Sequence, residues 1–509
     1  MRPHHPKMRT SYEFSGRSPI LSMSLHKKIF LFVLASMLAA CVPQSAWTMI
    51  PFPTTPTLTP FPTSVATPSR PHYSPGELVD YIAQSGDSLP ALAAHFNTTI
   101  DGIRKANPEI PSETTTMPPG MPMKIPIFYL PFWGTTVQIL PDSQYVDGPS
   151  AVGFDTSAFV NSHPGWLKDY NAYAAGANQS GAEIVDMVAL DYSISPRVLL
   201  ALLEYQTGAL SQPVAPTGDY PLGDVDYNYA GLYLQLIWAA NILNEGYYGW
   251  RTGSLTELDH PDGTIERPDP WQTAGTVAYQ YYFSLNSPLF QYTRASGPDG
   301  MARVYKSLFG DSFAANVNLP HIPVSLQQPE LVLPFAVGET WSLTGGPHAG
   351  WGTAALRPWS ALDFGPPVKG CNPYNHPVVA MADGVVVRSE TGLVMEDLDG
   401  DGKEQTGWDL LYLHIATVGR DQVGQKLRRG DPIGYASCEG GEATGTHVHI
   451  ARKYDGEWMP ADSIIPFDME GWIAHNGSAA YEGYLSRGTQ MVTACTCSNA
   501  ASHITAGEK

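Results

Sequence analysis

The sequence predicts a multidomain α+β protein with a small β-α-α-β module, a mostly helical middle domain and an antiparallel, β-rich C-terminal domain. Three observations predict this fold class. The 509 residues exceed what one hydrophobic core usually serves. Apolar residues recur at helical spacing between about residues 150 and 320. From about Pro329 onward, short runs of alternating polarity are separated by glycine-rich turns.

Composition and charge exclude some functions. Hydrophobic residues make up 43% of the chain and charged residues 15%, so most of the chain is expected to fold. The 29 Lys and Arg against 48 Asp and Glu give a net charge of -19. Because no excess of basic side chains is available to bind phosphates, nucleic acid is not an expected partner.

Residues 1–40 are predicted to be a signal peptide. Lys27 and Lys28 precede a short apolar run over residues 29–35, which is too short to span a bilayer comfortably. The run ends in Leu-Ala-Ala-Cys41, which resembles the lipobox of bacterial lipoproteins. That resemblance implies acylation of Cys41, a lipid anchor on a membrane, and a place in the bacterial cell envelope outside the cytoplasm. An ordinary signal peptide with a chance cysteine is the alternative.

Residues 41–75 are rich in proline and threonine, a composition that favours an extended spacer without a core. Apart from Cys41, four cysteines remain: Cys371, Cys438, Cys495 and Cys497. An even number outside the cytoplasm permits two disulfides, but spacing alone does not assign them.

Residues 78–128 are predicted to form a strand, two helices and a closing strand. A Gly-Asp-Ser-Leu sequence opens the first helix at residues 86–89, Asn107-Pro108 follows the second helix, and Gly-x-x-x-Lys-Ile-Pro closes the module at residues 120–126. Along its whole length this segment resembles the LysM module, whose family binds N-acetylglucosamine-containing polymers such as peptidoglycan. A small αβ domain without a ligand is the alternative reading.

The helical domain over residues 150–320 carries a fainter resemblance. Ser195-Pro196 provides a helix start before an apolar run that ends in Glu204-Tyr-Gln206-Thr-Gly. The run is similar to lysozyme-like domains, in which a catalytic acid follows the apolar helix. Here Gln206 takes that place, and an amide cannot act as a general acid. Glu204 lies at a different angle on the helix, so a non-catalytic scaffold or substrate-groove domain is the favoured interpretation.

Residues 329–470 carry the strongest candidate for a functional site. His447 and His449 alternate on a predicted strand, which directs two imidazoles to one face. Gly-Gly-Pro-His348, Asp363 and Leu-Tyr-Leu-His414 precede them. Together these motifs resemble the lysostaphin-type zinc endopeptidases, and most closely the staphylolysin branch. The resemblance implies that His348, Asp363 and His449 bind zinc.

The same resemblance assigns His414 and His447 to activation of water and stabilisation of the oxyanion. One departure concerns spacing, because the usual family pattern is His-x3-Asp and Trp359 stands four residues before Asp363. His348 is preferred as the first ligand because it lies in the expected turn, and His376 is the fallback. Residues 471–509 are expected to form a C-terminal extension.

A separate acidic loop contains Asp397, Asp399 and Asp401 at alternate positions, followed by Gly402. This pattern suits an oxygen-lined calcium loop, but Trp408 stands where an EF-hand requires glutamate. A hairpin turn that binds calcium and a solvated acidic turn both remain open.

The leading hypothesis is therefore a zinc endopeptidase that hydrolyses peptide stems or cross-bridges of peptidoglycan and is targeted by its LysM module. The alternative is a catalytically inactive lipoprotein that binds peptidoglycan or regulates another hydrolase.

Overall fold

The computed structural model describes residues 70–497 and 499–507. The predicted signal peptide, Cys41 and nearly all of the Pro/Thr-rich spacer lie outside the described residues. Within the described ranges, no helix has the length and apolar character needed to cross a membrane.

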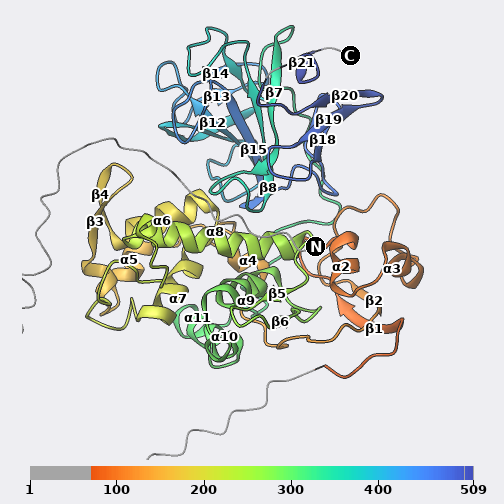
Figure 1. Cartoon of the computed structure of the whole chain (residues 1–509), viewed down its shortest axis with the longest axis vertical. Coiled ribbons are helices and arrows are strands. Elements are labelled where there is room, and N and C mark those ends of the chain that lie inside the picture. Colours follow the sequence, from red (N-terminus) through yellow and green to blue (C-terminus); the bar gives the residue numbers. More distant parts are fainter. Residues whose placement is uncertain (1–69, 498, 508–509) are drawn as a thin grey trace, which may run out of the picture. The chain divides into compact units, whose positions relative to one another are not determined.

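The β-α-α-β module has the predicted order of elements (Figure 1). Strand β1 pairs antiparallel with β2, and Ser88 caps α2 by accepting a hydrogen bond from the backbone N–H of Ala91. Leu92, Phe96 and Ile103 are fully buried between the helices and the strands. The elements are β1 (Glu77–Ile82), α2 (Leu89–His95), α3 (Ile100–Ala106) and β2 (Pro122–Ile127).

The middle domain is mostly helical, as predicted, and α7 and α8 are among the helices at its centre. In α7, Pro196 occupies the first turn and six consecutive residues, 198–203, are buried. The helices are α4 (Asp142–Tyr145), α5 (Thr156–Asn161), η1 (Trp166–Asp169), α6 (Gly181–Tyr192), α7 (Pro196–Thr207), η2 (Tyr227–Tyr229), α8 (Leu232–Arg251), α9 (Ala274–Asn286), α10 (Leu289–Ser296) and α11 (Met301–Phe309). Two short hairpins join them: β3 (Asn171–Ala174) with β4 (Ala177–Ser180), and β5 (Leu258–Asp259) with β6 (Ile265–Glu266).

The C-terminal domain is built on a nine-stranded sheet with the order β13-β10-β11-β12-β15-β8-β7-β21, in which β16 also pairs with β15. Every pairing in it is antiparallel, so the predicted fold class is confirmed. Its strands are β7 (Thr340–Ala349), β8 (Trp359–Gly365), β10 (Gly384–Glu390), β11 (Gly392–Asp397), β12 (Trp408–Ile415), β13 (Lys426–Leu427), β15 (Val448–Tyr454), β16 (Glu457–Trp458) and β21 (His503–Thr505).

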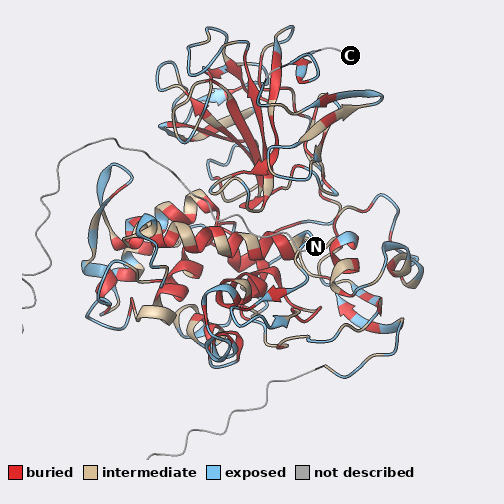
Figure 2. Ribbon diagram, in the orientation of Figure 1, coloured by how far each residue is buried: buried red, intermediate tan, exposed pale blue. Residues whose placement is uncertain are grey.

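The central strands β8 and β15 are buried along almost their whole length (Figure 2). Both faces of these strands are covered, so the polar residues that they carry are buried. Those polar residues include Asp363 and His449. A buried polar residue in such a strand requires a partner, so Asp363 and His449 are candidates for a shared site.

The sheet architecture continues beyond residue 470, where the sequence suggested that a separate extension begins. Strand β17 (Asp468–Met469) pairs with β18 (Trp472–Asn476), and β19 (Gly483–Arg487) and β20 (Gln490–Thr493) complete a four-stranded sheet. Strand β21 then adds to the edge of the large sheet by pairing with β7. A further small pair joins β9 (Val378–Val379) to β14 (Pro432–Gly434).

Candidate metal centre

Three adjacent strands position the proposed zinc ligands. Asp363 on β8 lies directly opposite His449 on β15 in the strand register, so their side chains share one face of the sheet. The β7–β8 hairpin places His348 on the same face of the sheet, because His348 lies opposite Ala361, which is two residues before Asp363 on β8. The connection over residues 350–358 therefore spans the long interval between His348 and Asp363.

The side-chain atoms of these three residues converge. His348 Nε2 lies 3.4 Å from Asp363 Oδ1, and His449 Nδ1 lies 3.2 Å from the same oxygen. The two ring nitrogens are 3.0 Å apart, and all three side chains are buried. Gly345 makes room for the carboxylate, since a Cβ there would lie 2.5 Å from Asp363 Oδ2.

The hydrogen bonds of the far ring nitrogens assign the tautomers. His348 Nδ1 lies 2.8 Å from the carbonyl oxygen of Gly346, and His449 Nε2 lies 3.1 Å from that of Gly350. A carbonyl accepts only, so each of these nitrogens carries the proton in the neutral ring. The facing nitrogens then both present lone pairs, and Asp363 Oδ1 is buried without a hydrogen-bond donor. Two lone pairs and an unpartnered carboxylate oxygen facing one point fit a cation such as zinc.

Electrostatics at this point favour a positive charge. Burial tends to raise the pKa of Asp363, but the neighbouring His348, His449 and His447 outweigh it and hold that pKa well below its ordinary value. Burial lowers the pKa of His449, whereas the carboxylate raises that of His348 against the effect of burial. The carboxylate therefore stays ionised in a buried place, which stabilises a cation between it and the imidazoles.

The two predicted catalytic histidines lie beside this cluster. His447 Nε2 is 3.9 Å from Asp363 Oδ1, and the rings of His414 and His447 are 4.4 Å apart between centroids. His414 is the extra residue of a bulge in β12, because Gly392 pairs with Ile415 and the next residue, Leu393, pairs with Leu413. Its φ of 64° is unusual for a residue other than glycine. Such strained positions concentrate at functional sites.

The protonation of His414 is set by its surroundings. Burial, together with His447 and His449, lowers its pKa to about 4. Its Nδ1 lies 2.8 Å from the carbonyl oxygen of Glu439, which holds the proton on that nitrogen. The other nitrogen, Nε2, is therefore free to accept a proton at neutral pH.

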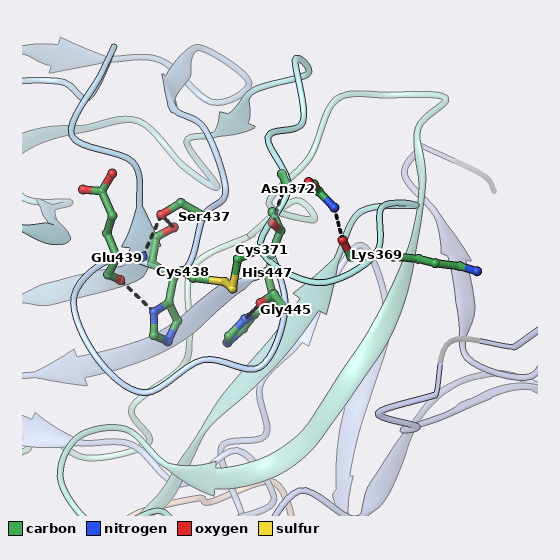
Figure 3. The surroundings of a disulfide bond; sticks show 10 residues. Lys369, Cys371, Asn372, Ser437, Cys438, Glu439, Gly445 and His447 are labelled. Carbon is green, nitrogen blue, oxygen red and sulfur yellow. Dashed lines mark hydrogen bonds between the residues drawn. A yellow bond between two sulfur atoms is a disulfide. The ribbon is translucent and has the colours of Figure 1, made fainter.

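A disulfide lies beside the contacts of both predicted catalytic histidines. Cys371 is bonded to Cys438, and Glu439, whose carbonyl binds His414, follows directly (Figure 3). Thr446, adjacent to His447, hydrogen-bonds the carbonyl oxygens of Gly370 and Asn372. The disulfide thus joins the loop that binds His414 to the loop that binds Thr446, the residue before His447. The second disulfide joins Cys495 to Cys497.

The sequence reading missed Tyr481. This residue lies between β18 and β19, and its ring stacks on His348 with 4.1 Å between ring centroids. It is 41% exposed, so it lies at the surface beside the candidate metal ligands. Its φ of 68° and a backbone hydrogen bond to Pro347 fix its position. No motif signalled it, because the contact depends on the fold of the segment that was expected to be an extension.

The fallback ligand His376 lies elsewhere. Its side chain is 54% exposed, and its Nδ1 lies 2.6 Å from Glu339 Oε1. It also stacks on Tyr374. Among the described residues, the side chains that converge with Asp363 as a potential metal site are those of His348 and His449. His376 is not one of them.

The lysozyme-like candidate in α7 has structural partners. Glu204 Oε2 accepts hydrogen bonds from the backbone N–H groups of Leu210 and Ser211, at 2.8 and 3.2 Å. Gln206 Oε1 accepts a hydrogen bond from the hydroxyl of Tyr282. Both side chains are therefore occupied in holding the turn after α7 and the neighbouring helix.

Comparisons with known families agree with this organisation. Residues 368–460 match peptidase family M23, residues 81–126 match the LysM domain, and residues 138–323 match the N-terminal domain of LasA. His414, His447 and His449 fall within the peptidase match, whereas His348 and Asp363 precede it. The chain is 26% identical over 345 residues to Protease LasA of Pseudomonas aeruginosa strain UCBPP-PA14, covering 63% of this chain and 74% of that protein.

Protease LasA of Pseudomonas aeruginosa strain PAO1 is 24% identical over 339 residues, with the same coverage. The solved structure of the M23 metalloprotease pseudoalterin, from the deep sea, is 22% identical and covers 33% of this chain and 96% of its own, with a TM-score of 0.28. The catalytic domain of lysostaphin from Staphylococcus simulans is 19% identical and covers 24% and 89%, with a TM-score of 0.18. The family matches confirm the resemblance of this chain to M23 metallopeptidases that carry a LysM module.

Proposed function

We propose that this protein is a zinc endopeptidase that hydrolyses peptide bonds in the stems or cross-bridges of peptidoglycan. The observation that carries the proposal is the buried convergence of His348 Nε2, His449 Nδ1 and the unpartnered Asp363 Oδ1. Two imidazoles and one carboxylate are the ligand set of a catalytic zinc site that keeps one position open.

The residues around the cluster suit peptide hydrolysis. When bound, zinc lowers the pKa of water and polarises a carbonyl group as a Lewis acid. His414, neutral and with a free Nε2, would accept the proton of the attacking water and return it to the leaving amine. As the imidazolium, with a proton on each ring nitrogen, His447 would donate a hydrogen bond from Nε2 to the carbonyl oxygen as negative charge develops there. Its Nδ1 is 2.8 Å from the carbonyl oxygen of Gly445, which orients the ring.

The LysM domain would bring this site to its substrate. The LysM family binds N-acetylglucosamine-containing glycan, and such binding would hold the peptide stems near the site. Acylation of Cys41 would anchor the chain in a membrane of the bacterial envelope, and the Pro/Thr-rich spacer would let the folded part reach the wall.

Mass spectrometry of purified peptidoglycan after digestion by the mature chain tests the reaction. We expect new amino termini and no new glycan ends. New glycan ends would indicate a glycosidase instead. The absence of both kinds of end would favour the non-catalytic binding or regulatory protein.

Zinc content tests the division of roles between two neighbouring histidines. His449→Ala removes one of three ligands, so the purified variant should contain almost no zinc. His447→Ala should retain zinc and lose turnover. Equal zinc loss in both variants would contradict the separate roles.

The first ligand is tested by a matched pair of variants. His348→Ala should lower zinc affinity and abolish hydrolysis, whereas His376→Ala, at the exposed histidine, should leave both nearly unchanged. The reverse ranking would make His376 the ligand.

The anchor is tested by Cys41→Ser. This variant should leave the membrane fraction while its hydrolysis of soluble fragments is unchanged. Its persistence in membranes would show that another segment provides the anchor.

A further inference from the structure

The Cys495–Cys497 disulfide closes a very short ring at the protein surface. Only Thr496 separates its two cysteines, whereas Cys371 and Cys438 lie 67 positions apart. Because a disulfide stabilises a fold mainly by constraining the unfolded chain, a cross-link across one residue contributes little stability. Cys497 is exposed and Cys495 is partly exposed, so a reactant in solution can reach the pair. The fold therefore gains little from keeping this pair oxidised.

The side-chain amide of Asn499 lies against both sulfurs. Its Nδ2 donates to Cys497 Sγ at 3.3 Å and to Cys495 Sγ at 3.5 Å. Its Oδ1 accepts a hydrogen bond from the backbone N–H of Ala501 at 2.8 Å. This contact assigns the orientation of the amide, because the opposite orientation would set its N–H groups against a backbone donor. One N–H of the amide is therefore available to each sulfur.

Backbone contacts to the large sheet fix Asn499. The hydroxyl of Ser502, a residue without solvent exposure, accepts the backbone N–H of Asn499 at 3.0 Å and donates to its carbonyl oxygen at 2.9 Å. The carbonyl oxygen of Ser502 accepts the backbone N–H of Leu343 on β7, and the carbonyl oxygen of Leu343 accepts that of Cys495. The same strand thus holds the amide of Asn499 and the backbone of Cys495, so the donors are in place before any reaction.

The two sulfurs differ in their surroundings. Cys495 Sγ receives a second donor, the backbone N–H of Cys497, at 3.2 Å. Hydrogen-bond donors stabilise a thiolate, and a stabilised thiolate is the better leaving group in thiol–disulfide exchange. Cys497 is the more exposed of the two residues. These contacts favour attack at Cys497 with departure of Cys495.

We propose that Cys495 and Cys497 form a thiol–disulfide exchange site that accepts electrons from external thiols, independently of the proposed peptidase reaction. An external thiolate attacks Cys497 Sγ, the S–S bond breaks, and its electron pair leaves on Cys495 Sγ. A second external thiolate then attacks the external sulfur of the mixed disulfide and releases Cys497 as a thiolate. The two external thiols end as one disulfide, and the two cysteines take up their two electrons and two protons.

Reduced glutathione is the probe, added to the folded mature chain. Free thiols are blocked with iodoacetamide at timed intervals, and the modified peptides are identified by mass spectrometry. We expect the Cys495–Cys497 pair to be reduced at least about tenfold faster than Cys371–Cys438. Early samples should carry glutathione on Cys497 and the alkyl group on Cys495. Reduction of the pair no faster than that of Cys371–Cys438 would overturn the proposal, and glutathione mainly on Cys495 would overturn the assigned direction of attack.

Two variants and a control test the donors while leaving both cysteines in place. Asn499→Ala should slow reduction of the pair at least about threefold, with reduction of Cys371–Cys438 as in the parent protein. Asn499→Asp keeps the shape of the side chain, removes both donors and adds a negative charge, so it should slow reduction further. Asn178→Ala, at an exposed asparagine on β4, should react like the parent. A parental rate of reduction in Asn499→Asp would overturn the role of the amide.

Discussion

Acidic side chains near apolar cores have different hydrogen-bond partners, and therefore different roles, in the two large regions of this protein. In the helical domain, Glu204 accepts two backbone N–H groups and completes the turn after α7. In the β domain, Asp363 keeps a buried oxygen without a donor, facing two imidazole lone pairs. A carboxylate whose acceptors are satisfied by the backbone stabilises the fold, whereas one left without donors among histidines is available for chemistry.

The largest effect should come from removing the charge at Asp363. Asp363→Asn keeps the shape of the side chain but offers zinc a neutral oxygen, so zinc affinity should fall at least about a hundredfold and hydrolysis should be lost. Zinc analysis and peptidoglycan digestion measure both. The matched variant in the helical domain, Glu204→Gln, should retain zinc and activity. A comparable loss of activity in Glu204→Gln would break the contrast between the two regions.

The Cys371–Cys438 disulfide tests whether the proposed catalytic histidines depend on the neighbouring loops. Replacing Cys371 and Cys438 by serine removes a cross-link between residues 67 apart, which should cost about 2–4 kcal/mol of stability. Hydrolysis should fall roughly ten- to a hundredfold, because His414 and His447 lose their positioning.

Zinc should remain in this variant, since its proposed ligands lie on β7, β8 and β15. Replacement of Cys495 and Cys497 is the control, because that disulfide closes a loop of only a few residues and should change activity little. Loss of zinc in the Cys371 and Cys438 variant would show that the loops also hold the ligands.

A second buried acid of the β domain predicts a pH dependence. Burial raises the pKa of Glu396 from 4.5 to about 8, although a hydrogen bond from Tyr412 opposes this. Between these values the folded chain holds a proton that the unfolded chain releases. Stability should therefore fall as pH rises from about 4.5 to 8, by up to about 1.4 kcal/mol per pH unit from this group.

Glu396→Gln should remove that part of the slope in denaturant melts at several pH values. An unchanged slope would show that the carboxyl is ionised in the folded protein.

The sequence predicted what depends on local pattern, and missed what depends on distant contacts. Alternating apolar residues predicted β12 and β15, and Gly-Asp-Ser-Leu at residues 86–89 predicted the start of the first LysM helix. The bulge that turns His414 toward the site depends on the register of β11 against β12. Tyr481 reaches His348 only through the pairing of β18 with β19, and the partner of Cys371 depends on the meeting of two loops.

The smallest effect should come from Glu204→Ala. Truncation leaves the N–H groups of Leu210 and Ser211 without their acceptor, which should cost about 1–2 kcal/mol of unfolding free energy. Ser211 is exposed and can bind water instead, so the loss should lie near the lower value. Glu204→Gln keeps an acceptor oxygen and should lose less, and neither variant should change peptide cleavage. If Gln206→Glu, which restores an acid where lysozyme-like domains carry one, produced new glycan ends, the helical domain would have to be regarded as a latent glycosidase rather than a scaffold.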